Sequence, residues 1–163
     1  MNGASLVPEF DVEMANTRKA LERVPDDKLD YKPHEKSFSL RDLAAHVANI
    51  PTWTDITLTT TELDLEQPFD RTLPTTRDEI LSHFDASVSS ARAVLEKTSA
   101  EEMKVDWTLR TGDQVWFSQP RSQIFRSFVM SHLVHHRAQL TVYLRLLDIP
   151  VPGMYGPSAD EEK

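Results

Sequence analysis

The chain has 163 residues, enough for one ordinary domain with its own hydrophobic core. It contains no cysteine, which excludes disulfides, thiolate nucleophiles, zinc fingers and iron–sulfur clusters and leaves nitrogen and oxygen as the ligands of any metal. The formal net charge of -8 argues against nucleic acid as a partner, because binding to a phosphate backbone requires clustered Lys and Arg.

Glycine and proline usage favours a helical protein. Only 4 glycines are present, and the 10 prolines lie mainly between periodic segments, which is typical of long helices joined by loops. No apolar run approaches the roughly 20 residues that span a bilayer, and no basic segment precedes an apolar one near the N-terminus. We therefore expect a cytoplasmic protein without a membrane partner. A single domain is predicted over residues 1–163, with a solvated tail over about 157–163.

Two amphipathic helices are predicted in the first third of the chain. The first extends over about residues 8–24, where apolar side chains recur at spacings of three and four until Pro25 ends the pattern. The second begins after Ser39, whose hydroxyl can cap a helix. Pro51 is expected to kink this helix because proline removes one backbone hydrogen bond. The apolar stripe of the second helix contains His46.

A long connection is predicted between the second and third helices. Residues 62–75 have no clear period and contain two prolines, which indicates an irregular crossover. The third helix is expected to begin at the capping-box pattern TRDE, which starts at Thr76. Its buried stripe is predicted to include Phe84 and Leu95.

The last part of the chain is predicted to form a short hairpin followed by the longest helix. Apolar and polar residues alternate over 104–118 around the turn sequence TGD. Pro120 suits a first helical position, and the helix that it opens extends to Leu147. Four helices with one long middle connection indicate an all-α four-helix bundle. Metal and cofactor sites in such bundles are formed by side chains that point inward from facing helices.

Three of the 6 histidines lie close together on the last predicted helix, in the segment SHLVHHRAQL. His132 and His136 are one turn apart on the apolar stripe, and His135 flanks them, while His46 lies on the stripe of the second helix. A buried imidazole without a partner costs about 1–3 kcal/mol, so these residues require an explanation. Either they bind one divalent metal with a fourth position open to a nucleophile, or they are core histidines satisfied by backbone carbonyls or buried water.

The remaining candidate polar residues have structural explanations. His34, in the loop before the second helix, and His83, near the polar side of the third, are expected to be solvated. Arg137 is expected to hold a carboxylate or a neighbouring carbonyl rather than a substrate. We assign no general base, because capping and solvation account for the carboxylates on or just beyond the second helix. These carboxylates are Asp42, Asp55 and Glu62.

Several aromatic residues could line an apolar pocket above a metal. Aromatic side chains at such positions more often belong to the core, so both interpretations stay open. The residues concerned are Trp53, Trp107, Trp116 and Tyr143.

The segments SLRDLAAHVANI and HLVHHRAQLTVYLRLLDIPVPGMYGPS resemble the DinB/YfiT family of metal-dependent enzymes over essentially the whole chain. The resemblance implies a four-helix bundle of up-down-down-up topology that often forms dimers. The family motif on the last helix is a histidine, three residues, a second histidine, an arginine, a small residue and a glutamine. The matching residues here are His132, His136, Arg137, Ala138 and Gln139. Many relatives have glycine in place of Ala138, a departure that affects helix packing rather than metal ligation.

The resemblance also implies a site and a type of chemistry. His46, His132 and His136 would hold one divalent ion, Zn²⁺ or Ni²⁺, and His135 would orient the site or accept a proton. The bound ion would activate a water for hydrolysis or a low-molecular-weight thiol for transfer, since the wider superfamily includes bacillithiol- and mycothiol-dependent transferases and isomerases. The alternative is a non-catalytic bundle that binds a metal or small ligand in a stress response. We expect a small-molecule substrate and a homodimer.

Overall fold

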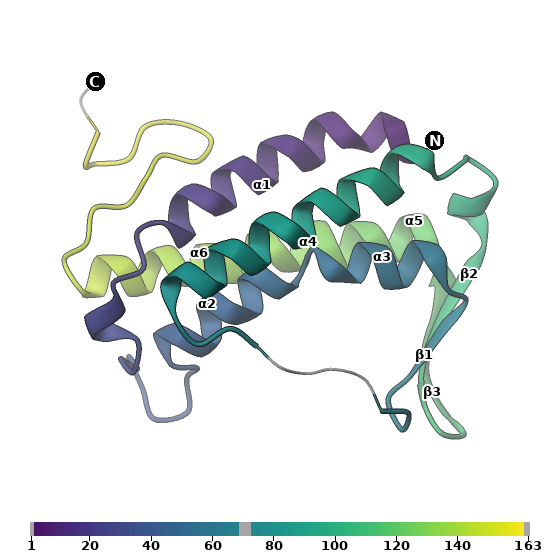
Figure 1. Ribbon diagram of the computed structural model, residues 1–163, viewed down its shortest axis with the longest axis horizontal. Coiled ribbons are helices and arrows are strands. Elements are labelled where there is room, and N and C mark those ends of the chain that lie inside the picture. Colours follow the sequence, from purple (N-terminus) through teal and green to yellow (C-terminus); the bar gives the residue numbers. More distant parts are fainter. Residues whose placement is uncertain (1, 69–72, 162–163) are drawn as a thin grey trace.

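Figure 1 shows a bundle of long helical segments with a small sheet at one end; this computed structural model describes residues 2–68 and 73–161. The first and last helical segments run away from the sheet, whereas the second and third run toward it. The predicted four-helix bundle of up-down-down-up topology is therefore confirmed. The three-stranded sheet, ordered β1-β2-β3, adds a feature to this largely helical fold.

The bounds of the elements follow the chain order. The α-helices are α1 (Val7–Leu21), α2 (Leu40–Asn49), α3 (Thr52–Thr59), α4 (Arg77–Lys97), α5 (Arg121–Ile124) and α6 (His132–Leu146). The 3-10 helices are η1 (Gly3–Leu6), η2 (Asp26–Lys28) and η3 (Glu102–Lys104), and η4 (Phe125–Ser131) is a π-helix. The strands are β1 (Glu62–Asp64), β2 (Asp106–Thr111) and β3 (Gln114–Pro120). No helix in the two described ranges is long and apolar enough to cross a membrane.

The first helix ends earlier than the sequence pattern predicts. Helix α1 stops at Leu21, because the chain tightens there into turns in which the N–H of Arg23 bonds the Ala20 carbonyl and that of Val24 bonds the Leu21 carbonyl. Val24 remains fully buried. The apolar spacing in the sequence therefore extends past the end of α1, because Val24 is buried by the turn and not by the helix.

Pro51 divides the second predicted helix into α2 and α3, as the expected kink required. The N-terminal cap is also confirmed, because the Ser39 hydroxyl accepts the N–H of Asp42 at 3.0 Å. The break places His46 in the last turn of α2. Trp53, beyond the proline, packs partly buried against the core.

A long connection joins α3, which ends at the sheet, to α4, which begins at the opposite end of the bundle (Figure 1). Part of it forms β1, which pairs in parallel with β2, so the prediction of a wholly irregular connection is wrong at this point. A strand of three residues is too short to show a period, and only its pairing partner defines it. Residues 69–72 of the predicted connection lie outside the described residues. The capping box at the start of α4, formed by Thr76 and Glu79, is confirmed.

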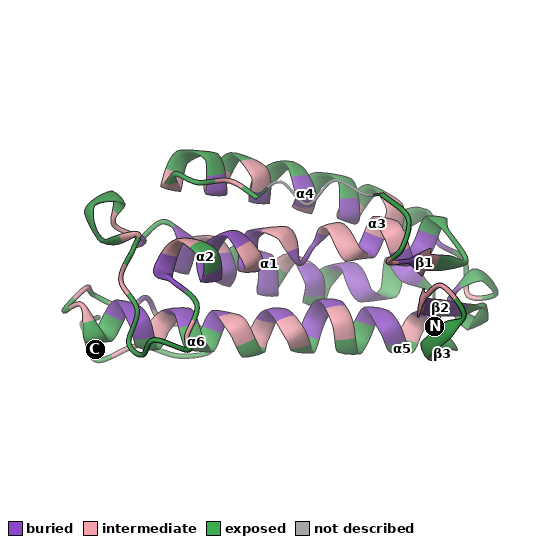
Figure 2. Ribbon diagram, turned by 90° about the horizontal axis from the view of Figure 1, so that it is seen from below, coloured by how far each residue is buried: buried purple, intermediate pink, exposed green. Residues whose placement is uncertain are grey.

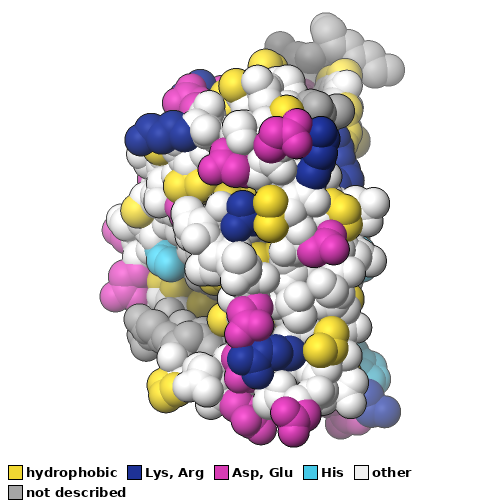
Figure 3. Space-filling model, turned by 90° about the vertical axis from the view of Figure 1, so that its right-hand side faces the viewer, with side chains coloured by type: hydrophobic (Ala, Val, Ile, Leu, Met, Phe, Trp, Pro, Cys, Tyr) yellow, Lys and Arg dark blue, Asp and Glu magenta, His cyan; other side chains and the backbone are white. Residues whose placement is uncertain are grey.

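The predicted hairpin is formed by β2 and β3, which pair antiparallel. The turn between them contains Gly112 with a φ of 53°, a left-handed conformation that glycine adopts without strain. Trp107 on β2 is fully buried and anchors the sheet on the bundle. Figure 3 views the molecule from this end and shows acidic and basic side chains interspersed on the surface. One example is Arg110, which forms ion pairs with Glu62 and Asp64.

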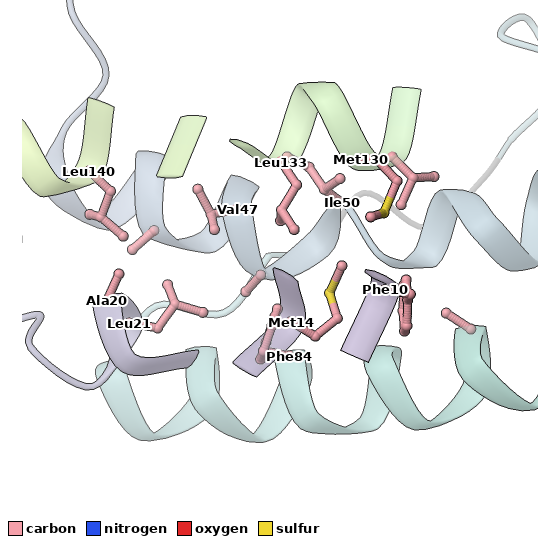
Figure 4. Close-up of a cluster of buried hydrophobic side chains, with 14 of the residues drawn as sticks. Phe10, Met14, Ala20, Leu21, Val47, Ile50, Phe84, Met130, Leu133 and Leu140 are labelled. Carbon is pink, nitrogen blue, oxygen red and sulfur yellow. The ribbon is translucent and has the colours of Figure 1, made fainter. Parts of the chain in front are cut away.

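The hydrophobic core lies between the four helical segments. In Figure 2 the buried residues of each segment face the interior of the bundle, and the exposed residues face outward. Figure 4 shows side chains of α1, α2, α4 and the last helix meeting in this core. The labelled residues are Phe10, Met14, Ala20, Leu21, Val47, Ile50, Phe84, Met130, Leu133 and Leu140.

The last predicted helix runs from Arg121 to Leu146, but its middle part is not α-helical. In η4 the backbone is wider, and the N–H of His132 bonds the carbonyl of Ser127, five residues earlier. A run of buried residues at a constant spacing of four crosses this segment. A regular α-helix, with about 3.6 residues per turn, would carry such a run progressively around its surface. The buried residues are Arg121, Phe125, Val129, Leu133 and Arg137.

Candidate metal centre

Helices α2 and α6 bring the three predicted metal ligands together. His46 is in the last turn of α2, and His132 and His136 lie one turn apart near the start of α6. One ring nitrogen of each residue lies within 4.8 Å of those of the other two. The Nε2 atoms of His46 and His132 are 3.1 Å apart. The rings belong to facing helices and converge on one point between them.

This spacing fits a single metal ion. With metal–nitrogen bonds of about 2.0 to 2.1 Å and tetrahedral angles, two ligand nitrogens lie about 3.3 Å apart. Within residues 2–68 and 73–161, no other histidine or carboxylate joins the cluster. Three imidazoles would therefore hold the ion from one side and leave a coordination position for a water or another small ligand.

The imidazoles are also in the protonation state that a metal requires. Burial, followed by the charges of His136 and His132, lowers the pKa of His46 to about 4. Burial is also the main cause that lowers the pKa values of His132 and His136. Neutral imidazoles have a free lone pair, so a metal entering near neutral pH need not displace protons from these rings.

Two neighbouring oxygens orient the rings of α6. The Nδ1 atom of His136 lies 2.7 Å from Oε1 of Gln139, and the Nδ1 atom of His132 lies 3.3 Å from the Phe128 carbonyl. Both oxygens only accept hydrogen bonds, so a hydrogen bond at either position requires the proton on Nδ1 and leaves Nε2 with its lone pair. The role of Gln139 was not foreseen from sequence, although its position three residues after His136 places it on the same helix face.

A hollow of about 330 Å³ borders the histidine cluster. His132 and Phe128 line it, and the Phe128 ring packs against Phe117 and Trp53, with centroids 4.8 and 5.9 Å away. The remaining lining residues are Ser127, Ser131 and His135. Two other hollows, of about 210 and 430 Å³, are lined by none of the three clustered histidines. Of these three hollows, the one beside His132 is the one that borders the cluster.

Comparison with known proteins identifies the group to which this architecture belongs. The model of the DinB family matches residues 2–163. The chain belongs to the DinB family. It is 28% identical over 159 residues to the uncharacterized protein YrdA of Bacillus subtilis, an alignment that covers 93% of this chain and 87% of YrdA.

Crystal structures of two DinB-like proteins share the fold. YjoA of Bacillus subtilis aligns with a TM-score of 0.70 and 18% identity, covering 90% of this chain and 95% of YjoA. A DinB-like protein of Bacillus cereus aligns with a TM-score of 0.69 and 21% identity, covering 92% and 95% of the two chains. At this identity the likeness concerns the arrangement of the helices.

The other histidines of this DinB chain lie outside the cluster. His135 is exposed beside His136, with ring centroids 4.8 Å apart, and borders the hollow without joining the candidate ligands. His34 is exposed, as predicted. The prediction that His83 is solvated is wrong, because α4 packs on α2 and the partly buried His83 places Nε2 2.9 Å from Oδ1 of Asn49.

The aromatic residues singled out in the sequence do not line the hollow. Trp107 and Tyr143 are core residues, and the partly buried Trp53 packs against Trp107, with ring centroids 6.3 Å apart. Trp116 is 62% exposed on β3. The aromatic residue that does line the hollow is Phe128, on η4.

The candidate acidic residues make structural contacts and take no part in the DinB histidine cluster. The backbone N–H of Asp42 binds the capping Ser39, and the Asp55 carboxylate accepts a hydrogen bond from Ser90 at 2.9 Å. Glu62 pairs with Arg110 beside the sheet.

Arg137 binds a carboxylate and a carbonyl, as predicted. Its guanidinium lies 2.7 Å from the Glu13 carboxylate and 3.0 Å from the Glu13 carbonyl. It also donates to the Tyr155 hydroxyl at 2.6 Å, and that hydroxyl donates to Glu13. This buried group ties α6 to α1 and to the C-terminal segment, so its contacts are structural.

The metal-free protein is expected to lose stability as the pH falls from 6.5 toward about 5. Because the pKa of His46 is about 4 when folded and 6.5 when unfolded, the unfolded chain binds a proton in this window that the folded chain does not. The free energy of unfolding therefore decreases as the pH is lowered, and the effect levels off below the folded pKa. Thermal unfolding at several pH values in the presence of a chelator measures it.

The control for this pH dependence is His46→Leu, which removes the titrating group from α2. Most carboxyl groups titrate below about pH 5, so a change in stability between pH 6.5 and 5 reports mainly on histidines. The variant should show a shallower dependence of melting temperature on pH than the natural chain. Equal slopes for the two proteins would contradict the prediction.

Proposed function

We propose that this protein is a metal-dependent enzyme in which His46, His132 and His136 hold one divalent ion, Zn²⁺ or Ni²⁺, and act on a small-molecule substrate. The observation that carries the proposal is the convergence of three neutral imidazoles beside a hollow, with no fourth ligand among the described residues. A closed structural site would use four protein ligands, whereas catalytic sites keep one position open.

The residues of the chain would position the ion and form the wall beside it. The imidazoles hold the ion from the bundle side, and Gln139 fixes which nitrogen of His136 faces it. The Phe128 ring forms an apolar wall of the hollow beside His132. A divalent ion bound there lowers the pKa of a coordinated water or thiol and so supplies the nucleophile near neutral pH.

Two reactions are compatible with this arrangement. In hydrolysis, an activated water attacks the substrate carbonyl or phosphoryl centre and displaces the leaving group. In thiol transfer, the sulfur of a low-molecular-weight thiol attacks an electrophilic carbon, the bond from that carbon to its leaving group breaks, and the thiol proton passes to solvent. Ion identity stays open as well, because imidazole ligands accept Zn²⁺, Ni²⁺, Co²⁺ and Cu²⁺.

The function is tested on full-length, untagged protein. Elemental analysis should find about one divalent ion per chain, since the described residues contain one candidate cluster. A screen then follows conjugation of several low-molecular-weight thiols to monochlorobimane, and a parallel panel follows hydrolysis of esters and amides. We expect turnover in one of the two panels, with loss of that turnover on metal removal and in His136→Ala. His34→Ala is the matched control, because His34 is exposed and outside the cluster.

The outcomes separate the proposed enzyme from its alternative. Protein without bound metal, and without metal uptake on addition of Zn²⁺ or Ni²⁺, would contradict the metal centre. Stoichiometric metal without turnover in either panel would favour a non-catalytic metal-binding protein of a stress response. The homodimer stays a prediction, and light scattering of the purified protein measures it.

A further inference from the structure

The π-helical segment η4 ends immediately before His132, the first candidate ligand on the last helix. Such wide turns are rare, because their hydrogen bonds are less favourable than those of an α-helix, and they occur mostly at functional sites. Residues on both sides of η4 are α-helical. The segment therefore interrupts a helix that could otherwise continue without it.

The interruption changes the partner of one carbonyl group. In an α-helix, the N–H of His132 would bond the Phe128 carbonyl, four residues earlier. Here that N–H bonds the carbonyls of Ser127 and Val129 instead. The Phe128 carbonyl thereby loses its α-helical donor, and the Nδ1 atom of the His132 ring lies 3.3 Å from it. The side chain of the candidate ligand therefore contacts a carbonyl whose α-helical donor bonds elsewhere.

We propose that η4 is a positioning element of the metal centre and that Phe128 is its positioning residue. The π turn releases the Phe128 carbonyl, and this carbonyl holds the Nδ1 proton of His132 so that Nε2 faces His46 and the metal. The same turn places the Phe128 ring in the wall of the hollow. This inference rests on the proposed metal centre, because it concerns how the backbone orients His132, one of the three candidate ligands.

The spacing of the buried residues shows how the π turn can be removed while the fold is retained. A π turn is equivalent to one extra residue in an α-helix. Deleting one residue between Phe125 and Val129 changes one interval of the buried run from four to three, as a regular α-helix requires. Ser127 is the suitable residue, because it is exposed and its hydroxyl hydrogen-bonds, among the described residues, only the carbonyls of Gln123 and Ile124 in its own helix.

The experiment compares the natural protein with a Ser127 deletion. The deletion should keep its circular dichroism spectrum and cooperative unfolding, because both halves of the helix retain their buried faces. Its affinity for Zn²⁺, measured by competition with a chromophoric chelator, should fall about 10- to 100-fold, the usual effect of losing a hydrogen bond to a ligand imidazole. A folded deletion variant with the affinity of the natural protein would overturn the proposal.

The matched control is Ser127→Ala, which removes the hydroxyl but preserves the chain length and therefore the π turn. Its Zn²⁺ affinity should equal that of the natural protein. An equal loss of affinity in this variant would assign the effect to the serine side chain and overturn the role of the turn.

A second measurement needs neither the deletion nor bound metal. Long-range ¹H–¹⁵N correlation spectra of the full-length, metal-free protein report which nitrogen of each imidazole carries the proton. We expect His132 as the Nδ1–H form, held by the Phe128 carbonyl. A proton on Nε2 would overturn the inference. If the protein binds no metal but His132 shows the Nδ1–H form, the proposed function fails while the hydrogen bond from the π turn stands.

Discussion

Replacing His132 with alanine is expected to abolish stoichiometric binding of Zn²⁺ and Ni²⁺. The variant keeps two of the three converging imidazoles, His46 and His136, and two ligands from different helices hold an ion far less tightly than three. The loss of affinity should exceed the roughly 100-fold that removal of a ligand's hydrogen-bonding neighbour causes. Isothermal titration calorimetry and elemental analysis after dialysis measure it.

The control for this prediction is His34→Ala, which removes a histidine that is exposed in the loop before α2. It should retain the full metal content, which excludes a general effect of lowering the number of histidines. Unchanged metal content in His132→Ala would show that the ion, if present, binds elsewhere. The circular dichroism spectrum of the variant should remain helical, because the His132 side chain is only partly buried.

Replacing Arg137 with methionine is expected to destabilise the fold by about 3 to 5 kcal/mol, the range measured when one partner of a buried ion pair is removed. The side chains of Arg137 and Glu13 are only 3% and 11% exposed, so the remaining carboxylate would lie in the core without its cation. For a chain of this size, each kcal/mol shifts the melting temperature by about 2 to 4 °C, giving a decrease of roughly 6 to 20 °C. Differential scanning calorimetry measures the shift.

The matched variant for Arg137 is the double substitution Glu13→Leu with Arg137→Met. Replacing both charges by apolar groups removes the unpaired carboxylate, so the double variant should regain much of the lost stability. A single Arg137→Met variant with natural stability but impaired turnover would contradict the structural role. It would instead indicate that Arg137 contacts the substrate.

Most of the helical architecture could be predicted from local patterns. The Ser39 cap, the break at Pro51 and the capping box at Thr76 each depend on residues close together in the sequence, and the structure contains all three. The juxtaposition of the candidate ligands could also be predicted. His132 and His136 share a helix face because of their spacing, and His46 lies on an apolar stripe that must face another helix.

Features that depend on distant partners could not be predicted in this way. Strand β1 is too short to show a period and exists because β2 lies beside it. His83 was expected in solvent, but the packing of α4 on α2 brings it to Asn49. The role of Phe128 also depends on the three-dimensional structure, since its ring lines the hollow beside His132 and packs against Phe117 of the hairpin and Trp53 of α3.

The π turn lies between these two cases. The sequence contains the run from Arg121 to Arg137 in which every fourth residue is buried in the structure, and this constant spacing indicates a π turn. Any short part of the same run also fits the apolar stripe of an α-helix. By itself, the sequence determined which residues face the core, because helical periodicity and capping are local properties. Only the tertiary structure decided where the backbone widens and how the three imidazoles converge, because these depend on packing between helices far apart in the chain.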